Sequence, residues 1–143
     1  MLFQNIEECA IAFYLNRKYP FFKVYSLVTG KLIRGVNYYD HIPTGWKIAF
    51  GEEMANEIKK YLKEEGLINA FKVDQIKEKF GELRLYFHLE SGTMEDFRNL
   101  EKIIDKYTEK SRTVCIHCGK PATKKTKGWI SFLCGECYQR RLK

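Results

Sequence analysis

The sequence predicts an α+β fold: a small domain of helices and antiparallel hairpins, followed by a short cysteine-rich module. Along residues 1–110, segments with the 3.6-residue period of a helix alternate with pairs of segments that have the two-residue period of a strand. Residues 111–143 then hold four of the five cysteines, arranged as two Cys-x-x-Cys pairs. We therefore expect an α+β domain over 1–110 and a separate module over 111–143.

The first part of the chain predicts a helix followed by a hairpin. Apolar residues recur at helical spacing over 5–17, and Pro20 ends this helix because proline has no backbone N–H to continue it. Residues 21–28 are rich in aromatic and β-branched side chains, which favour strands. Gly30 marks a turn, after which 31–36 is expected to return as the second strand.

The middle of the chain predicts a second helix and a second hairpin. Apolar residues from Phe50 to Leu62 keep helical spacing, and Gly66 follows where a helix commonly ends. Residues 70–79 and 82–89 have the composition of strands. Apolar and polar residues alternate strictly in the second of these strands, which indicates one buried side and one side facing water. The side expected to face water consists of Glu82, Arg84, Tyr86 and His88.

A third helix is expected to begin after Thr93. Asp96 stands three residues later, where a capping box usually has Glu or Gln. Trp46 and Trp129 are expected to anchor hydrophobic cores, and Cys9 to be a buried thiol on the first helix. The buried stripe of the third helix is expected to consist of Met94, Phe97, Leu100, Ile103, Ile104 and Tyr107.

The cysteine pairs carry the strongest chemical signal in the chain. Fifteen residues separate Cys115 and Cys118 from Cys134 and Cys137. Zinc prefers four ligands in a tetrahedron, with thiolate sulfur at roughly 2.3 Å, and each Cys-x-x-Cys turn offers two corners. Four thiolates close the coordination shell, so the predicted Zn²⁺ is structural rather than catalytic. Disulfides are the alternative, but nothing in the sequence suggests a secreted chain.

The segments around the cysteines predict the form of this module. Gly119 follows the first pair at a tight turn, and residues 121–132 predict a hairpin with its turn near Gly128. The second pair is expected on the first turn of a C-terminal helix. This order of knuckle, hairpin and helix, over residues 113–143, resembles a zinc-ribbon or treble-clef module. The resemblance implies a metal-held fold and no particular activity, because many unrelated functions share it.

The positive charge of the chain is concentrated in the same module. The net charge is +7, and residues 1–110 are neutral while 111–143 hold eight basic residues and one acid. Zn²⁺ with four thiolates has a formal charge of −2, so the module would remain positive and attract polyanions. A basic surface that serves solubility alone is the alternative. The residues expected to contact nucleic acid are Lys124, Lys125, Lys127, Arg140 and Arg141.

A longer string of motifs resembles uncharacterised proteins of bacteriophages and prophages. It consists of Gly45-Trp46, Lys-x-Lys-Phe-Gly-x-Leu-Arg-x-Tyr over 77–86, Cys-x-x-Cys-Gly over 115–119, and Gly128-Trp129 before the last cysteines. The resemblance spans residues 42–138. It implies a phage-associated origin and a location in the host cytoplasm, and it brings no established activity.

A protein–protein interaction module is the second functional hypothesis. In this case residues 1–110 would bind and modulate a host enzyme or defence protein, and aromatic side chains would anchor the interface. For Arg84 and Tyr86 the alternative is that they simply belong to an ordinary polar outer face, since antiparallel sheets commonly leave one face in water. The expected interface residues are Tyr38, Tyr39, Trp46, Arg84 and Tyr86.

Catalysis and membrane insertion are not expected. The sequence has no GxGxxG, P-loop, HExxH or GxSxG motif, and the adjacent Asp40 and His41 are expected to point apart. A deep pocket that joined His41 or His88 to a carboxylate would instead favour an enzyme. No apolar run approaches the ~20 residues of a membrane span, and the N-terminus carries acids where a signal peptide is basic. The expected compartment is the cytoplasm.

Overall fold

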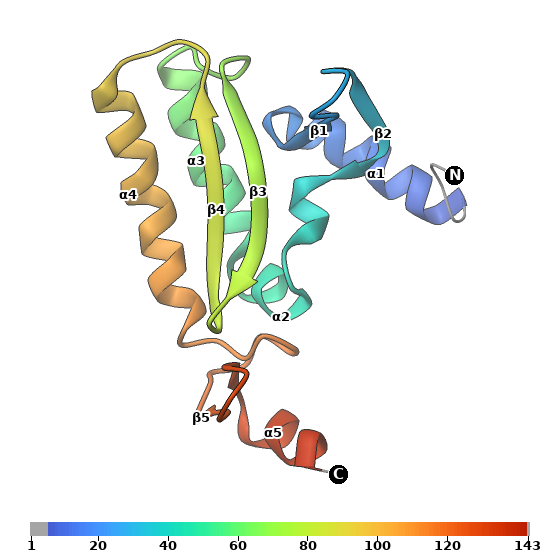
Figure 1. The fold of residues 1–143 in the computed structure, drawn as a ribbon, viewed down its shortest axis with the longest axis vertical. Coiled ribbons are helices and arrows are strands. Elements are labelled where there is room, and N and C mark those ends of the chain that lie inside the picture. The colour runs from blue at the N-terminus through green and yellow to red at the C-terminus, as the bar shows by residue number, and fades with distance from the viewer. Residues whose placement is uncertain (1–5, 143) are drawn as a thin grey trace.

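The computed structural model describes residues 6–142, with side chains from residue 10 onward. Helices alternate with small antiparallel sheets, as the sequence predicts for an α+β fold (Figure 1). The side chain expected to be a buried thiol, Cys9, lies outside the described side chains. None of the described helices is long and apolar enough to cross a membrane.

The N-terminal part has the predicted helix and hairpin, with shorter strands. Helix α1 (Ile6–Lys18) is followed by a 3-10 helix, η1 (Pro20–Phe22). Strand β1 (Lys23–Tyr25) pairs antiparallel with β2 (Leu32–Asn37). The strand expected over 21–28 is shortened at both ends. Its first two residues belong to η1, where both phenylalanine side chains are buried in the core, and its last three, 26–28, lie in the turn that leads to β2.

A continuous helical stretch follows over 44–64. A short 3-10 helix, η2 (Tyr38–His41), occupies the segment before it. The stretch comprises α2 (Thr44–Trp46), a π-helical segment η3 (Lys47–Gly51) and α3 (Glu52–Glu64). Gly66 has a φ of 68° just beyond its end, as expected for a helix-ending glycine.

The central hairpin consists of β3 (Phe71–Lys79) and β4 (Glu82–Leu89). Its turn, Phe80-Gly81, has positive φ at both residues, 55° and 84°, which is the backbone of a type I′ hairpin turn. Helix α4 (Met94–Ser111) begins with the predicted capping box of Thr93 and Asp96. Helices α3 and α4 cover one side of this hairpin (Figure 1).

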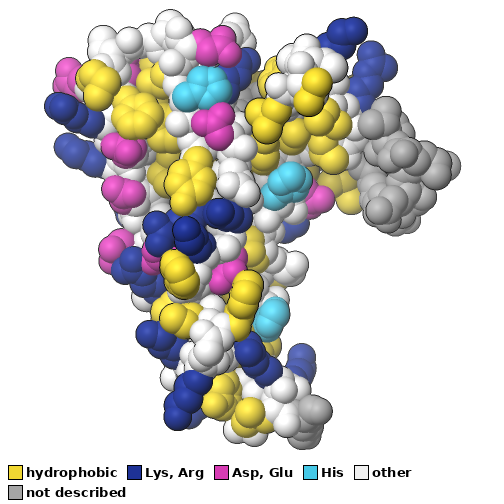
Figure 2. All heavy atoms as spheres, viewed as in Figure 1, with side chains coloured by type: hydrophobic (Ala, Val, Ile, Leu, Met, Phe, Trp, Pro, Cys, Tyr) yellow, Lys and Arg dark blue, Asp and Glu magenta, His cyan; other side chains and the backbone are white. Residues whose placement is uncertain are grey.

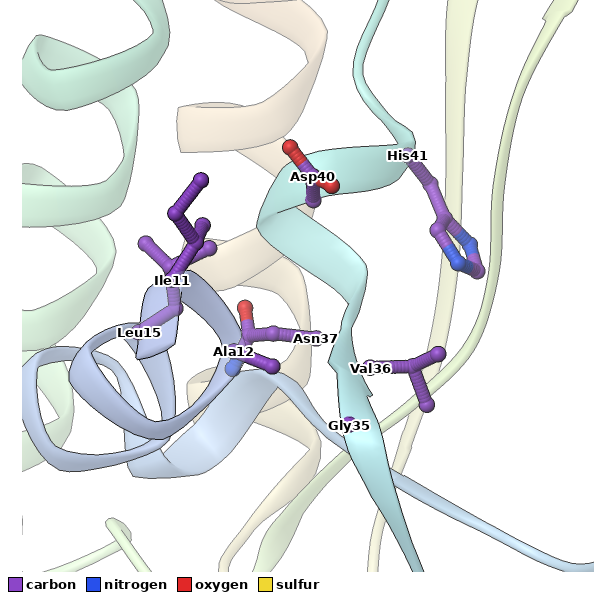
Figure 3. A pocket seen from close by; sticks show the side chains of 8 residues that line it. All are labelled: Ile11, Ala12, Leu15, Gly35, Val36, Asn37, Asp40 and His41. Atoms are coloured by element: carbon purple, nitrogen blue, oxygen red, sulfur yellow. The ribbon is translucent and has the colours of Figure 1, made fainter. Parts of the chain in front are cut away.

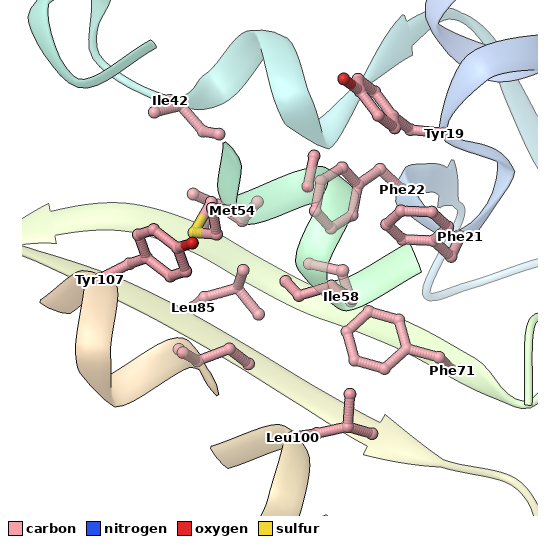
Figure 4. Packing of buried hydrophobic residues seen from close by; sticks show 14 of the residues in the cluster. Tyr19, Phe21, Phe22, Ile42, Met54, Ile58, Phe71, Leu85, Leu100 and Tyr107 are labelled. Atoms are coloured by element: carbon pink, nitrogen blue, oxygen red, sulfur yellow. The ribbon is translucent and has the colours of Figure 1, made fainter. Parts of the chain in front are cut away.

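The core lies between the hairpin, these helices and the N-terminal part of the chain, which contributes Tyr19, Phe21 and Phe22 (Figure 4). Trp46 is 0% exposed and its ring stacks on Phe50 at 6.4 Å between centroids, so its prediction as a core anchor is confirmed. The same burial makes its assignment to a surface interface wrong. Met94 is also a wrong prediction, because it is 65% exposed and the buried stripe of α4 starts later.

Glu82 corrects the prediction for the outer side of β4. It is 8% exposed rather than facing water, because its carboxylate lies between two guanidinium groups. Arg84 Nη2 lies 2.5 Å from one carboxylate oxygen, and Arg112 binds the other. Arg112 follows the last residue of α4, so this ion-pair cluster joins β4 to the beginning of the C-terminal module.

The C-terminal module has the predicted order of knuckle, hairpin and helix. Strand β5 (Lys124–Lys125) pairs antiparallel with β6 (Phe132–Leu133), and α5 (Gly135–Leu142) follows. The module lies at one end of the molecule, below the turn of the β3–β4 hairpin in Figure 1. Its small core is separate from the main one and contains Leu133, which is fully buried, with three of the cysteines.

Candidate metal centre

The four cysteines of the module gather at one point. The sulfur atoms of Cys115, Cys118, Cys134 and Cys137 all lie within 4.8 Å of one another, and those of Cys118 and Cys134 are 3.5 Å apart. All four are free thiols rather than disulfides. A zinc ion bound to four thiolates at roughly 2.3 Å spaces its sulfurs about 3.8 Å apart. The cluster is therefore compatible with one tetrahedral metal ion.

The first pair is held by a tight knuckle turn. Cys115 N donates a hydrogen bond to Lys120 O at 2.7 Å, and Gly119 N donates to Cys115 O at 3.0 Å. Gly119 has a φ of 82°, which glycine adopts without the strain that a side chain would bring. This turn directs both sulfurs of the pair to the same side, and His117 between them is exposed, as expected for a residue that is not a ligand.

The second pair stands where β6 passes into α5. Cys134 directly precedes the helix, and Cys137 lies in its first turn. Cys137 N donates to Cys134 Sγ at 3.4 Å, which orients the sulfur of Cys134 over the start of the helix. The position of the second pair at a helix start is thus confirmed.

The cysteines cannot all lose their protons easily without a cation among them. Burial would raise the pKa of Cys115, but backbone N–H groups, led by that of Cys134, outweigh burial and hold its pKa at about 6. The thiol of Cys134 and then burial raise the pKa of Cys137 to about 12. One thiolate therefore forms readily and disfavours the next, since like charges lie close together. A divalent metal ion would supply the missing positive charge, so the donor set fits such an ion.

The knuckle rests directly on the N-terminus of α2. Gly45 N donates a hydrogen bond to Ile116 O at 2.8 Å. A Cβ at position 45 would lie 2.0 Å from Cys115 O, which no side chain tolerates. In the Gly45-Trp46 motif, the glycine thus permits backbone contact with the turn of the first cysteine pair, while the tryptophan enters the core.

A second contact joins the module to the β3–β4 turn. A Cβ on Gly81 would lie 2.9 Å from the ring of Phe132 and 3.0 Å from Ile130. Both neighbours belong to the second half of the module's hairpin. The phenylalanine–glycine motif of the central hairpin is therefore also a docking point for the module. Sequence reasoning interpreted Gly81 only as a turn residue and missed this contact.

The five residues expected to contact nucleic acid lie on the exposed surface of the module. Arg140 is paired with Glu136 at 2.9 Å, and Lys120 reaches the same carboxylate at 3.5 Å. The other four expected residues form no ion pair with any residue that the structure describes: Lys124, Lys125, Lys127 and Arg141. Lysine and arginine side chains are spread over this end of the molecule among apolar ones, and more of them gather above it in Figure 2.

Trp129 is exposed rather than buried, which corrects its prediction as a core anchor. It is 74% exposed at the tip of the module's hairpin, between β5 and β6. Trp129 belongs to the loop that joins β5 to β6, whereas the small core is formed by Leu133 and three cysteines, so its ring is not part of that core. The apolar pattern of Trp129, Ile130 and Phe132 does not distinguish a buried ring from an exposed one.

The residues expected to form a protein interface differ in their exposure. Tyr38 and Tyr39 are half-buried, and burial raises the pKa of Tyr39 to about 12. Arg84 is engaged with Glu82, and only Tyr86, at 43%, is well exposed. Of the five expected residues, Tyr86 thus offers the most exposed aromatic ring for a contact.

Asp40 and His41 point apart, as expected, at a pocket of about 190 Å³ (Figure 3). Lys47 Nζ binds Asp40 Oδ1 at 2.8 Å, whereas the ring of His41 meets that of Tyr38 edge-on at 5.3 Å. The pocket lies between α1 and β2 and brings no further acid or base to this pair.

His88 does meet a carboxylate. Its Nδ1 lies 2.8 Å from Asp74 Oδ1, at a cleft of about 270 Å³ between the two hairpins. Asp74 stands at the irregularity in the β3–β4 register, between Val73 and Gln75, which directs its side chain toward His88. Ser26 also lines the cleft, but its hydroxyl oxygen accepts the N–H groups of the two residues of its own turn. The described residues of this cleft thus present a hydrogen-bonded pair without an arranged nucleophile.

Comparison of the chain with protein-family models, with curated proteins and with solved structures gave no match. The resemblance to phage and prophage proteins therefore stays a prediction that depends on the motifs alone. The geometry of the cysteines and the distribution of charge are the features from which a function can be argued.

Proposed function

We propose that the protein is a non-enzymatic, zinc-stabilised protein of phage type that binds nucleic acid, or a host complex containing it, through its basic C-terminal module. The observation that carries this proposal is the set of three hairpin lysines, Lys124, Lys125 and Lys127. All three are exposed, and no acid among the described residues neutralises them. Unpaired cations clustered on one element are the electrostatic footprint of phosphate binding.

Zinc at the cysteine cluster would hold this hairpin in shape. The strands β5 and β6 have two residues each, which is too short for a hairpin to be stable alone. A structural metal ion contributes folding free energy directly in modules of this size. The four thiolates would fix the ends of the hairpin and the start of α5, so that the lysines keep one arrangement.

The basic surface continues from the module onto the central hairpin. Lys79 and Lys77 lie on β3, next to the turn that contacts the module, and Lys79 is exposed. A strand of phosphates that crosses the module would therefore meet further positive charge on β3 (Figure 2). Contacts of lysine with phosphate carry no sequence information, so binding is expected to be general rather than sequence-specific.

A salt titration tests the proposal. Binding of the zinc-loaded protein to a generic 20-nucleotide oligonucleotide, measured by fluorescence anisotropy, should weaken steeply as salt rises. A Lys124→Ala/Lys125→Ala/Lys127→Ala variant should lose most of the affinity and reduce the logarithmic salt slope by about 2 to 3, roughly one for each lost phosphate contact. The control is Lys60→Ala/Lys63→Ala/Lys102→Ala, which removes three exposed lysines from α3 and α4. Absent binding at low salt, or equal loss in both variants, would reject the proposal.

A protein-binding module is the second candidate, and a different surface favours it. Leu27 and Val28 are neighbours in the loop between β1 and β2, and they are 98% and 94% exposed. Apolar side chains grouped in this way are typical of contact surfaces for other proteins. A host protein retained from lysate after nuclease treatment, and lost with Leu27→Ser/Val28→Ser, would support this candidate. Retention that disappears with nuclease would support nucleic-acid binding instead.

A further inference from the structure

A cleft opens where the turn of the central hairpin meets the turn of the module's hairpin. We call it the two-turn cleft. Its volume is about 230 Å³, below the 300 to 1,000 Å³ that is usual for pockets that take drug-sized ligands. It is lined by Glu78, Lys79, Phe80, Gly128, Trp129 and Ile130. The dimensions suit a single flat group rather than an extended small molecule.

The stability of the hairpin does not explain why a phenylalanine occupies position 80. Its φ of 55° is a left-handed conformation that is unfavourable for a bulky side chain, and it is the one described residue other than glycine with positive φ. The first position of a type I′ turn prefers asparagine, aspartate or glycine. Burial does not compensate, since the side chain is 65% exposed. An exposed aromatic ring in a strained position points to a role in binding.

Trp129 faces the same cleft from a well-fixed turn. Thr126 N donates to Ser131 O at 3.0 Å, and Ser131 N donates to Thr126 Oγ1 at 2.8 Å. Thr126 Oγ1 in turn donates to the backbone oxygen of Trp129 at 2.5 Å, so the side chain of Thr126 holds the turn from inside. The indole is therefore exposed on a backbone that is already ordered, which reduces the entropy lost when a ligand stacks on it.

Positive charge surrounds these two rings. Lys79 Nζ lies 5.6 Å from the ring centroid of Phe80, and Lys127 is exposed two residues before Trp129. Glu78 is the one acid of the lining, and its carboxylate accepts the N–H of Gly81 at 2.8 Å, which engages it in the turn. The cleft thus combines aromatic rings with flanking cations, a combination typical of sites for single-stranded nucleic acid.

We propose that the two-turn cleft receives an unpaired base of a single-stranded nucleic acid, with Phe80 and Trp129 as its stacking surfaces. The adjoining phosphates would lie on Lys79 and Lys127. Duplex bases are stacked on their neighbours and are not free to enter a cleft, so single strands are favoured over duplexes. This inference rests on the proposed function, because the lysines bring the strand to the module.

Three probes of equal length distinguish binding of the base from binding of the phosphates: a single-stranded oligothymidylate, an abasic oligonucleotide, and a duplex. The abasic probe keeps the phosphates but has no base to stack. The zinc-loaded protein should bind the oligothymidylate at least about ten-fold more tightly than the abasic probe, given the usual strength of base–aromatic stacking. The oligothymidylate should also quench the fluorescence of exposed Trp129, while Trp46 is fully buried and should change little.

Phe80→Asn and Trp129→Ala test the two rings. Phe80→Asn creates the preferred Asn-Gly turn, so the variant should unfold at the same temperature as the native protein or higher. Both variants should lose the preference for the oligothymidylate and keep their affinity for the abasic probe. The matched control is Phe13→Ala, which removes an equally exposed ring, 65%, from α1. It should leave all three affinities unchanged.

The outcomes separate this inference from the proposed function. Equal affinity of the native protein for the oligothymidylate and the abasic probe would overturn the role of the cleft and leave the phosphate-binding function intact. A preference that persists in both ring variants would also overturn it. Binding to none of the three probes at low salt would reject the proposed function together with this inference.

Discussion

Gly45 lies against Cys115 so closely that their backbones touch. A Cβ on residue 45 would stand 2.0 Å from Cys115 O, and Gly45 N donates to the neighbouring Ile116 O at 2.8 Å. The cysteine cluster is therefore not an independent appendage, because the start of α2 is packed on its knuckle. This relationship predicts that the metal site can be weakened from the α+β domain.

Gly45→Ala is expected to destabilise the module without changing a cysteine. The added methyl group has to displace backbone, and overpacking of this kind typically costs about 1–3 kcal/mol. We expect a lower melting temperature and faster zinc transfer to a colorimetric chelator. The matched control is Gly135→Ala, whose Cβ would meet only Thr123 Oγ1, at 4.0 Å. If both variants released zinc at the native rate, the contact would not support the site.

Removal of the metal is expected to unfold the module and leave the α+β domain folded. The two regions have separate hydrophobic clusters, and the smaller one consists of Leu133 with three cysteines. A protein purified under reducing conditions should contain one zinc per chain by mass spectrometry of the metal. After chelation, hydrogen exchange should become fast over 113–142 and stay slow over β3, β4 and α4. Cooperative unfolding of the whole chain on chelation would show that the two regions are one folding unit.

The elements that depend on local pattern were predictable from the sequence. The capping box of Thr93 and Asp96, the helix-ending Gly66 and the strands on either side of Gly81 each have a short-range signature. The cysteine cluster was predictable for the same reason, since its spacing specifies ligands within two short turns. Each of these features is specified within its own segment, whatever packs against that segment in the folded protein.

The misassigned residues depend on contacts between segments distant in sequence. Glu82 alternates with apolar neighbours as a surface residue does, but Arg112, thirty positions later, makes its burial favourable. Trp46 and Trp129 each follow a glycine, and only the tertiary structure buries the first and exposes the second. A single sequence carries no signal for such pairings, which explains why the docking roles of Gly45 and Gly81 were also missed.

Ser111 is expected to be important for the attachment of α4 to β4. Its buried Oγ accepts the N–H of Leu83 at 2.9 Å and donates to Thr108 O at 2.6 Å. Ser111→Ala would leave the N–H of Leu83 buried without a partner, which typically costs about 1–3 kcal/mol. Chemical denaturation should show this loss, with an unchanged dependence on denaturant concentration. Thr113→Ala is the control, because its hydroxyl is exposed and should contribute little. Equal stability of the two variants would contradict the assignment.

The carboxyl of Glu57 is expected to make the stability of the folded protein depend on pH, whether or not a metal ion is bound. Burial is the largest single influence and opposes ionisation of its carboxyl. The hydrogen bonds of Lys106, at 2.5 Å, and of Tyr107, together with the charge of Lys106, outweigh burial and lower its pKa below the ordinary 4.5. A carboxyl with a lowered pKa in the folded state stabilises the protein fully above pH 4.5, and this contribution disappears as pH falls through the folded-state pKa. The pair is partly exposed, so its contribution should be only about 0.5–1 kcal/mol.

The difference in melting temperature between the native protein and Glu57→Gln isolates this effect, because acid release of zinc affects both proteins alike. The native protein should be more stable at pH 7, and the two melting temperatures should converge progressively below pH 4.5. Glu101→Gln provides the control, since Glu101 is exposed in the middle of α4, away from the helix ends, and forms no ion pair among the described residues. Its melting temperature should change with pH as that of the native protein does. A difference for Glu57→Gln that stays constant down to pH 3 would mean that lost packing, rather than lost charge, accounts for the destabilisation.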